Sequence, residues 1–393
     1  MPWKETHVTE ERMSFVSRLR TGERMSDLCS EYGISRKTGY KVLARFEQDS
    51  AAGLLDRRPV PLRIPHRTPE PTVALIRELR LQHPTWGAKK LKAYLERHQP
   101  GVRIPAASTV GDILERQGLV SRCRRRRRPL RLQADKLRKS ERPNEVWSID
   151  FKGQFRLGNG KRCFPLTVTD HYSRAYLGLE ALDDTTSLPV EAAMSRVFEV
   201  HGLPDAIRSD NGVPFASTSL GGLSRLSVWW MKLGIVPERI DPGKPQQNGR
   251  HERSHLTLKQ ETARPAANNS LAQQERFDDW LTTYNRERPH EALDMKTPWE
   301  LYAPSRRKLP DALPTFDYAL YDDVMTVNRG GRISFGRAKK CCVGAALAGE
   351  TVGVREVGPD CWLVAFLTME LGVYDRKNNR FTPNDHLSFS PHH

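Results

Sequence analysis

Three acidic residues in separate stretches of the chain are candidates for metal-dependent phosphoryl transfer. Asp150 lies in the segment VWSIDF, Asp210 in RSDNG and Glu252 in PQQNGRHER. Carboxylates are hard oxygen ligands, which suit Mg²⁺ or Mn²⁺. Two such ions about 3.5 to 4 Å apart can activate the attacking oxygen and hold the leaving oxygen of a phosphodiester. If the acids converge, the sequence predicts a nuclease or strand-transferase with two ions per site.

Each acid taken alone has a simpler explanation. An isolated Asp after a strand is more often a turn residue or a helix cap than a metal ligand. The three contexts together favour the metal site. Other acids nearby are weaker candidates: Glu238 and Asp241 precede the helix in a proline-rich stretch, and Glu261 lies more than two turns beyond Glu252. We expect Asp170 to be structural or to support a metal ligand.

The order of three motifs, WSIDFKG, SDNGVPF and PGKPQQNGRHERSHLTLKQE, resembles the catalytic core of DDE transposases and retroviral integrases. The chain is most similar to bacterial insertion-sequence transposases, in particular insertion sequence family four-eight-one. The resemblance covers residues 143–303. It implies a ribonuclease-H-like fold and a metal-dependent DDE-type polynucleotidyl transferase. Asp150, Asp210 and Glu252 would be both the catalytic residues and the ligands of the two ions, Mg²⁺ or Mn²⁺.

The spacing of the third acid departs from the family pattern. Between Asp210 and Glu252 lie 41 residues, more than integrase-like cores usually have. A Ser/Gly-rich stretch at residues 216–225 can hold the extra residues as a surface loop, which costs little entropy. We therefore keep Glu252 as the third acid, with Glu261 as a distant second.

Helical spacing supports that choice. Glu252, His255 and Lys259 recur at i, i+3 and i+7 and so share one helix face. The resemblance implies that a basic residue two turns past the glutamate contacts the DNA end, and Lys259 occupies that position. Polar residues at the helix start are candidates for phosphates near the scissile bond, although each singly fits a solvated surface: Gln247, Asn248 and Arg250.

Residues 1–56 have the pattern of a DNA-binding helix-turn-helix. Residues 25–32 and 36–46 read as helices around the turn Gly33-Ile34-Ser35, and Ser35 is a plausible N-cap. A small helical bundle with a solvated charged face would have the same pattern. The DNA reading leaves four residues of the second helix free for a major groove: Arg36, Lys37, Tyr40 and Lys41.

A linker rich in Pro and Arg at residues 57–71 precedes a second helical unit at residues 72–120. This unit fits a second helix-turn-helix or a winged helix, with helices at 72–80, 88–95 and 108–117. We expect Ser108 and Thr109 to cap the last helix and Trp86 to lie in the core. Its candidate phosphate contacts are Lys89, Lys90 and Arg103.

Residues 121–142 carry 11 basic and two acidic side chains, which predicts an extended basic arm. A solvated linker is the simpler reading, but five consecutive arginines are a dense phosphate ligand. They are Arg124, Arg125, Arg126, Arg127 and Arg128. The net charge of +16 lies entirely before residue 143, with 32 basic and 16 acidic residues there and 31 of each afterwards. The N-terminal third is therefore expected to hold double-stranded DNA.

From residue 143 the pattern predicts a multidomain α/β protein. Strands at 146–151, 163–169, 175–180 and 206–209 and helices at 189–201, 223–233 and 248–261 predict a sheet covered by helices on both faces at residues 143–305. Short alternating strands at residues 306–393 predict a small β-barrel or sandwich.

Composition excludes several classes. No apolar run approaches the 18 or so residues that a membrane span needs, and residues 1–13 do not resemble a secretory signal. We expect a cytoplasmic, bacterial, nucleoid-associated protein. Six cysteines without C-x-x-C spacing predict reduced, buried thiols rather than a zinc finger.

These features together predict a DNA transposase. It would bind terminal inverted repeats, nick the 3′ ends of the element with metal-activated water and join the 3′-hydroxyl to target DNA. Work on two ends at once implies a homo-oligomer. The alternatives are a catalytically inactive, transposase-derived DNA-binding regulator and a structure-selective nuclease of the same fold.

Overall fold

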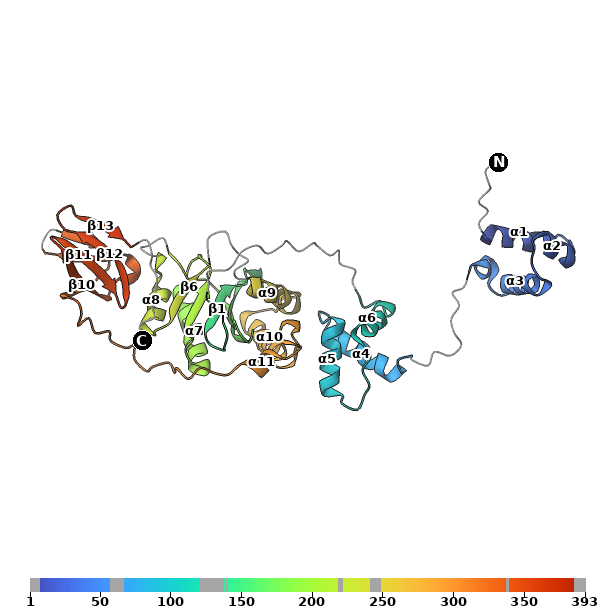
Figure 1. Ribbon diagram of the computed structural model, residues 1–393, viewed down its shortest axis with the longest axis horizontal. Coiled ribbons are helices and arrows are strands. Elements are labelled where there is room, and N and C mark those ends of the chain that lie inside the picture. Colours follow the sequence, from blue (N-terminus) through green and yellow to red (C-terminus); the bar gives the residue numbers. More distant parts are fainter. Residues whose placement is uncertain are drawn as a thin grey trace. The chain divides into compact units, whose positions relative to one another are not determined.

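The protein divides into two compact units, residues 1–67 and 68–393 (Figure 1). The structure, a computed structural model, describes residues 8–56, 67–120, 138, 140–217, 222–240, 249–336 and 339–384. Of residues 249–253 and 339 it describes the backbone alone. Within those ranges no helix is both long and apolar enough to cross a membrane.

The first unit is a helix-turn-helix, as predicted. It contains α1 (Val8–Arg20), α2 (Met25–Glu31), α3 (Arg36–Asp49) and the short 3₁₀ helix η1 (Ser50–Leu54). The predicted cap is confirmed, because the Ser35 side chain accepts a hydrogen bond from the Thr38 amide at 3.2 Å. Phe15, Val16 and Leu28 form the centre of a small core between the helices.

The second helical unit comprises α4 (Glu70–Gln82), α5 (Ala88–His98) and α6 (Ala107–Arg116). Trp86 is buried among Ile76, Leu91 and Val110, as expected. The predicted cap of the third helix is wrong: α6 begins one residue earlier, after Ala106, so that Ser108 and Thr109 lie inside the helix. Residues 67–120 contain no strand, which favours a helix-turn-helix over a winged helix.

A mixed sheet forms the middle of the chain. Its strands are β1 (Val146–Phe151), β2 (Phe155–Arg156), β3 (Arg162–Asp170), β4 (Tyr176–Leu182), β5 (Ala206–Ser209) and β6 (Val236–Arg239). Strand β3 pairs antiparallel with β1, β2 and β4, whereas β5 pairs parallel with β1 and β6. The order across the sheet is β4-β3-β1-β5-β6, so β1, whose first four residues are all buried, is central.

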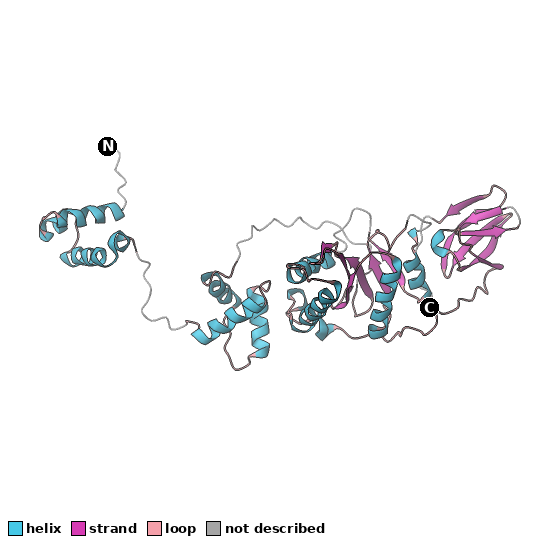
Figure 2. Cartoon of the chain, turned by 180° about the vertical axis from the view of Figure 1, so that it is seen from behind, coloured by secondary structure: helices cyan, strands magenta, loops and turns pink. Residues whose placement is uncertain are grey.

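Helices cover both faces of this sheet (Figure 2). On one face, Trp147 and Ile149 pack with residues of α7 (Ser187–His201) and α8 (Arg225–Lys232). On the other, Tyr176 and Leu179 pack with residues of α9 (Gly249–Thr262) and α10 (Ser270–Thr282). Two core faces arise because side chains alternate along each strand. The predicted helix-covered sheet is confirmed.

The chain after α10 continues through η4 (Thr283–Glu287), η5 (Glu291–Leu293) and α11 (Pro298–Leu301). Here Asn285 is buried and bonds both main-chain groups of Tyr176 at the start of β4, at 2.9 and 2.8 Å. The segment therefore packs against the sheet.

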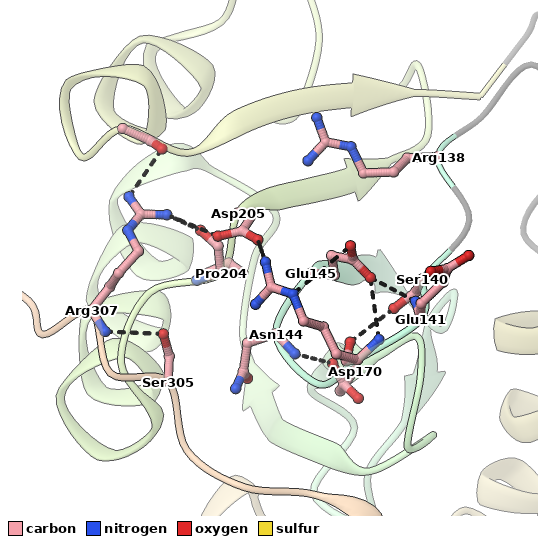
Figure 3. Close-up of polar contacts among 12 residues, drawn as sticks. Arg138, Ser140, Glu141, Asn144, Glu145, Asp170, Pro204, Asp205, Ser305 and Arg307 are labelled. Atoms are coloured by element: carbon pink, nitrogen blue, oxygen red, sulfur yellow. Dashed lines mark hydrogen bonds and ion pairs between the residues drawn. The ribbon is translucent and has the colours of Figure 1, made fainter. Parts of the chain in front are cut away.

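The chain enters the core through a polar network (Figure 3). Arg142 pairs with Asp205 at 2.7 Å, and the Asn144 amide donates to Asp170 at 2.8 Å. The buried carboxylate of Asp170 also accepts from the amide and hydroxyl of Ser173. Asp170 pairs with Trp147 in the β1–β3 ladder, and Trp147 is three positions before Asp150 in β1. Asp170 therefore lies away from Asp150 along the strand, and its role is structural.

The C-terminal region is an antiparallel sheet. Five strands follow the order β13-β12-β11-β10-β7, and β8 pairs with β9 separately. Their bounds are β7 (Asp323–Thr326), β8 (Arg332–Phe335), β9 (Lys339–Cys342), β10 (Thr351–Gly358), β11 (Cys361–Phe366), β12 (Met369–Asp375) and β13 (Arg380–Pro383), with the 3₁₀ helix η6 (Ala345–Leu347) before β10. The β-rich prediction is confirmed, and closure into a barrel stays a prediction.

The described cysteines are free thiols, but the expectation that they are buried holds only for some of them. Cys29, Cys163 and Cys341 are buried, whereas Cys342 is exposed and Cys361 is half-buried. Burial raises the pKa of Cys163 and of Cys341 to about 12, so both stay protonated and unreactive.

Candidate active site

The first two acids come together through the pairing of β1 and β5. These parallel strands pair Val146 with Ala206 and Ser148 with Arg208. The same register continued by two residues brings Asp150 opposite Asp210, which directly follows β5. Neighbouring strands lie about 4.8 Å apart, and residues in register point to the same face. The Asp150 side chain is 21% exposed, so the pair is reachable from solvent.

The turn after β5 holds the carboxylate of Asp210. Its Oδ1 accepts a hydrogen bond from the Gly212 amide at 3.1 Å. A Cβ on Gly212 would lie 3.1 Å from Oδ2 of Asp210, tighter than ordinary contact. The glycine of the SDNG motif therefore keeps the space beside this acid open.

The third acid lies in the first turn of α9, and the side chain of Glu252 is outside the described residues. The next turn of that helix is described. His255 Nδ1 lies 3.7 Å from Oδ2 of Asp150, and its Nε2 lies 2.8 Å from Oγ1 of Thr167 on β3. Because residues three apart share a helix face, the backbone of Glu252 lies about one turn before His255, the residue that faces Asp150. This arrangement supports convergence of the three acids.

The two described acids fit a divalent cation. Two carboxylates on neighbouring strands repel each other unless a positive charge lies between them. Their oxygen atoms are the ligands that Mg²⁺ prefers. Among the side chains that the structure describes, no group of three metal-binding residues occurs, and the side chain of Glu252 lies outside them.

Two of the alternative candidates for the third acid are paired with arginines. Glu261 accepts from Arg288 at 3.1 Å and also bonds Trp280 and Thr85. Glu238 pairs with the buried guanidinium of Arg208 at 2.9 Å. Paired carboxylates of this kind are structural, so the fallback assignment of the third acid to Glu261 is wrong. Asp241 lies outside the described residues.

The residues predicted to contact DNA differ in their exposure to solvent. All four candidates on α3 are exposed, and Tyr40 is 59% exposed although it is aromatic. Arg103 is exposed, Lys90 is half-buried, and Lys89 lies 3.3 Å from Glu291. The arginines Arg124 to Arg128, Gln247 and Asn248 lie outside the described residues, and only the backbone of Arg250 is described.

A small hollow brings Lys259 near Lys152, a lysine that was not among the candidates from the sequence. Both line it, with apolar walls that include Phe155, Leu258 and Phe277. Lys152 is two residues after Asp150 in the motif WSIDFKG, so its place in that motif was the available signal. Two lysines that line one hollow suit a phosphate group.

Family models match most of these regions. Two models of the integrase core domain match residues 140–245 and 233–298, which include all three acids. The chain contains an integrase core. A helix-turn-helix model matches residues 11–61, and a homeodomain-like model matches residues 38–114. The ribonuclease-H-like class predicted for the middle of the chain and the helix-turn-helix class predicted for its start are confirmed.

Relatives of the integrase core come from insertion elements. The chain is 29% identical over 253 residues to an uncharacterized 31.7 kDa protein of insertion element IS407 from Burkholderia multivorans, covering 64% of this chain and 87% of that protein. It is 28% identical over 245 residues to an uncharacterized 39.2 kDa protein of IS476 from Xanthomonas euvesicatoria, covering 62% and 68%. These matches support a DNA transposase or integrase of the bacterial insertion-sequence type.

Solved structures similar to the chain include viral integrases. The catalytic core domain of HTLV-2 integrase in complex with magnesium, in its trimeric form, matches with a TM-score of 0.34 and 18% identity, over 42% of this chain and all of that one. The simian T-cell lymphotropic virus intasome matches with a TM-score of 0.37 and 18% identity, over 75% of this chain and 97% of that one.

Proposed function

We propose that the protein is a metal-dependent transposase that moves an insertion element. Its helix-turn-helix units and basic arm bind the terminal inverted repeats, and its integrase core cuts and joins DNA. Hydrolysis first breaks the phosphodiester at the 3′ end of the element and frees a 3′-hydroxyl. That hydroxyl then attacks a phosphodiester of the target, and the target's own 3′-oxygen leaves.

The register of β1 and β5 carries this proposal. Continued two residues past its last pair, Ser148 with Arg208, it would set Asp150 opposite Asp210. The contact of His255 with Asp150 supports a place for Glu252, one turn earlier in α9, near the same strand end. An alignment of acids at a strand end has no structural purpose in a protein that only binds DNA. The inactive regulator is therefore the less favoured alternative.

The cofactor in this proposal is Mg²⁺ or Mn²⁺, two ions per site, held by Asp150, Asp210 and Glu252. When bound, such ions activate the attacking oxygen and stabilise charge on the leaving oxygen. The protein contributes the placement of the ligands and of the DNA. Lys152 and Lys259 would hold the strand beside the acids, and Gln247, Asn248 and Arg250 would bind phosphates at the start of α9.

Two ends must be cut and joined together, so the active form in this proposal is a homo-oligomer that bridges two element ends. The C-terminal sheet would contribute protein or DNA contacts, as a small β-barrel. Membership of insertion sequence family four-eight-one also remains a prediction, which terminal inverted repeats flanking the gene would test.

The decisive experiment uses Glu252→Gln with labelled element-end DNA and Mg²⁺. The substitution removes the charge and keeps the size, so nicking should fall by a factor of about 10³ or more, the loss expected when a group acting in the transition state is removed. Asp279→Asn, an exposed acid on α10, is the matched control and should cut like the wild type. Retained nicking by Glu252→Gln would refute the assignment. Repeat-specific binding without nicking by the wild type would favour the regulator instead.

A further inference from the structure

A buried chain of contacts connects the strand of the first acid to the helix of the third. The hydroxyl of Thr167 donates to the main-chain carbonyl of Asp150 at 2.8 Å and lies 2.8 Å from Nε2 of His255. Thr167 and His255 are 0% and 2% exposed. The chain thus runs from β1 through β3 to α9 without reaching solvent.

The direction of these hydrogen bonds follows from the chemistry of the hydroxyl. A threonine hydroxyl has one proton, and here that proton is donated to the Asp150 carbonyl. The hydroxyl must then accept from His255, so Nε2 carries a proton. The imidazole is held in one orientation, which directs Nδ1 toward Oδ2 of Asp150 at 3.7 Å.

The same helical turn has a second contact. Ser254 Oγ lies 2.6 Å from the hydroxyl of Tyr176, a buried residue of β4. Ser254 and His255 directly follow the turn that contains Glu252. Besides the packing of Leu258, helix α9 therefore contacts the sheet through polar groups of Ser254 and His255. Of these two contacts, the one made by His255 also lies 3.7 Å from Asp150.

We infer that His255 is a positioning residue for the metal site: through Thr167 it fixes the distance between the strand end of Asp150 and the helix of Glu252. Nothing in its contacts requires it to touch substrate. The inference rests on the proposed function, because it assigns His255 a role only if Asp150 and Glu252 bind the same ions. If His255 only filled the core, its loss would lower stability and leave metal affinity unchanged.

The test measures Mn²⁺ binding to the full chain without DNA, by calorimetry or by the electron paramagnetic resonance of free Mn²⁺. His255→Phe keeps a ring but removes the hydrogen bond, and should weaken Mn²⁺ binding by about tenfold or more, as residues that orient metal ligands do. His255→Gln can still donate to Thr167 and should restore most of the affinity. Thr167→Val breaks the same link at constant size and should behave like His255→Phe, so it replaces that variant if the latter does not fold.

Two controls separate the outcomes. Tyr176→Phe removes the hydrogen bond between Tyr176 and Ser254 of α9. It should lower the unfolding temperature and have a smaller effect on Mn²⁺ binding. Asp150→Asn should abolish that binding. Wild-type Mn²⁺ affinity in His255→Phe or Thr167→Val, together with loss of binding in Asp150→Asn, would overturn the role of His255 alone. Wild-type affinity in Asp150→Asn as well would overturn the proposed function.

Discussion

Acidic residues of the integrase core fall into two groups by their surroundings. Asp170 accepts three hydrogen bonds from Asn144 and Ser173, and Glu238 and Glu261 each pair with an arginine. These carboxylates are satisfied by protein groups and hold loops together. Asp150 lies near the end of β1, and Asp210 directly follows β5, which pairs with β1. Asp150 faces His255 at 3.7 Å, and Asp210 accepts a hydrogen bond from the Gly212 amide. These two acids are the ones that the proposed function assigns to a cation.

Two buried histidines should make stability depend on pH. Burial lowers the pKa of His201 to about 4, and burial with nearby Lys90 and Arg288 lowers that of His290 to about 3. Below pH 6.5 the unfolded chain takes up protons that the folded one does not. The free energy of unfolding should therefore decrease on acidification from pH 6.5 to 4, by up to about 1.4 kcal/mol per pH unit for each group.

Urea unfolding at pH 7, 6 and 5 measures this slope. His290→Gln should flatten it, whereas His98→Gln, a substitution at an exposed histidine, should leave it as in the wild type. Equal stability at pH 7 and pH 5 would contradict the expectation.

At the scale of helices and strands, the sequence predicts the features that local residue patterns determine. The apolar residues of the segment VWSIDF mark β1, and the Ser35 cap marks the start of α3. Strand β6 was missed because it is short, half-buried and contains Pro237, which a strand tolerates only at an edge or a bulge. The β1–β5 register and the contact of His255 with Thr167 join residues 60 and 88 positions apart. No local pattern encodes such pairings, so the structure was needed to connect the acids.

Two helical glycines give a paired prediction. Alanine usually stabilises a helix by about 1 kcal/mol over glycine. At Gly39 of α3, however, a Cβ would lie 2.7 Å from Sγ of Cys29 and 2.8 Å from Sδ of Met25. Gly39→Ala should therefore lower the free energy of unfolding by about 1–3 kcal/mol, because overpacking outweighs propensity.

Gly111 of α6 is the matched control. A Cβ there meets only the Cβ of Ala88, at 3.9 Å, which is ordinary contact. Gly111→Ala should raise stability by about 0.5–1 kcal/mol. Thermal unfolding of both variants measures the difference. A Gly39→Ala protein as stable as the wild type would show that α2 can move away from α3 to make room for the methyl group.

At the scale of the whole chain, charge is divided between parts with different tasks. All of the +16 surplus precedes residue 143, and the remainder is balanced. Family models assign helix-turn-helix regions to the basic part and the integrase core to the balanced part. Long-range attraction to a polyanion is therefore concentrated in the part of the chain that contains the helix-turn-helix regions.

This division predicts how DNA binding responds to salt. Each phosphate contact contributes about 0.9 to the slope of log K against log salt concentration. Replacing Arg36, Lys37 and Lys41 on the exposed face of α3 with alanine should reduce that slope by up to about 3, measured by fluorescence anisotropy between low and moderate salt. A charge-matched triple substitution uses Arg376, Lys377 and Arg380, all exposed in the C-terminal sheet region. It should change the slope little if that sheet contributes protein contacts, and should reduce it if the sheet contributes DNA contacts. An unchanged slope in the α3 variant would mean that this helix does not face the phosphates, because losing three contacts must release fewer counterions.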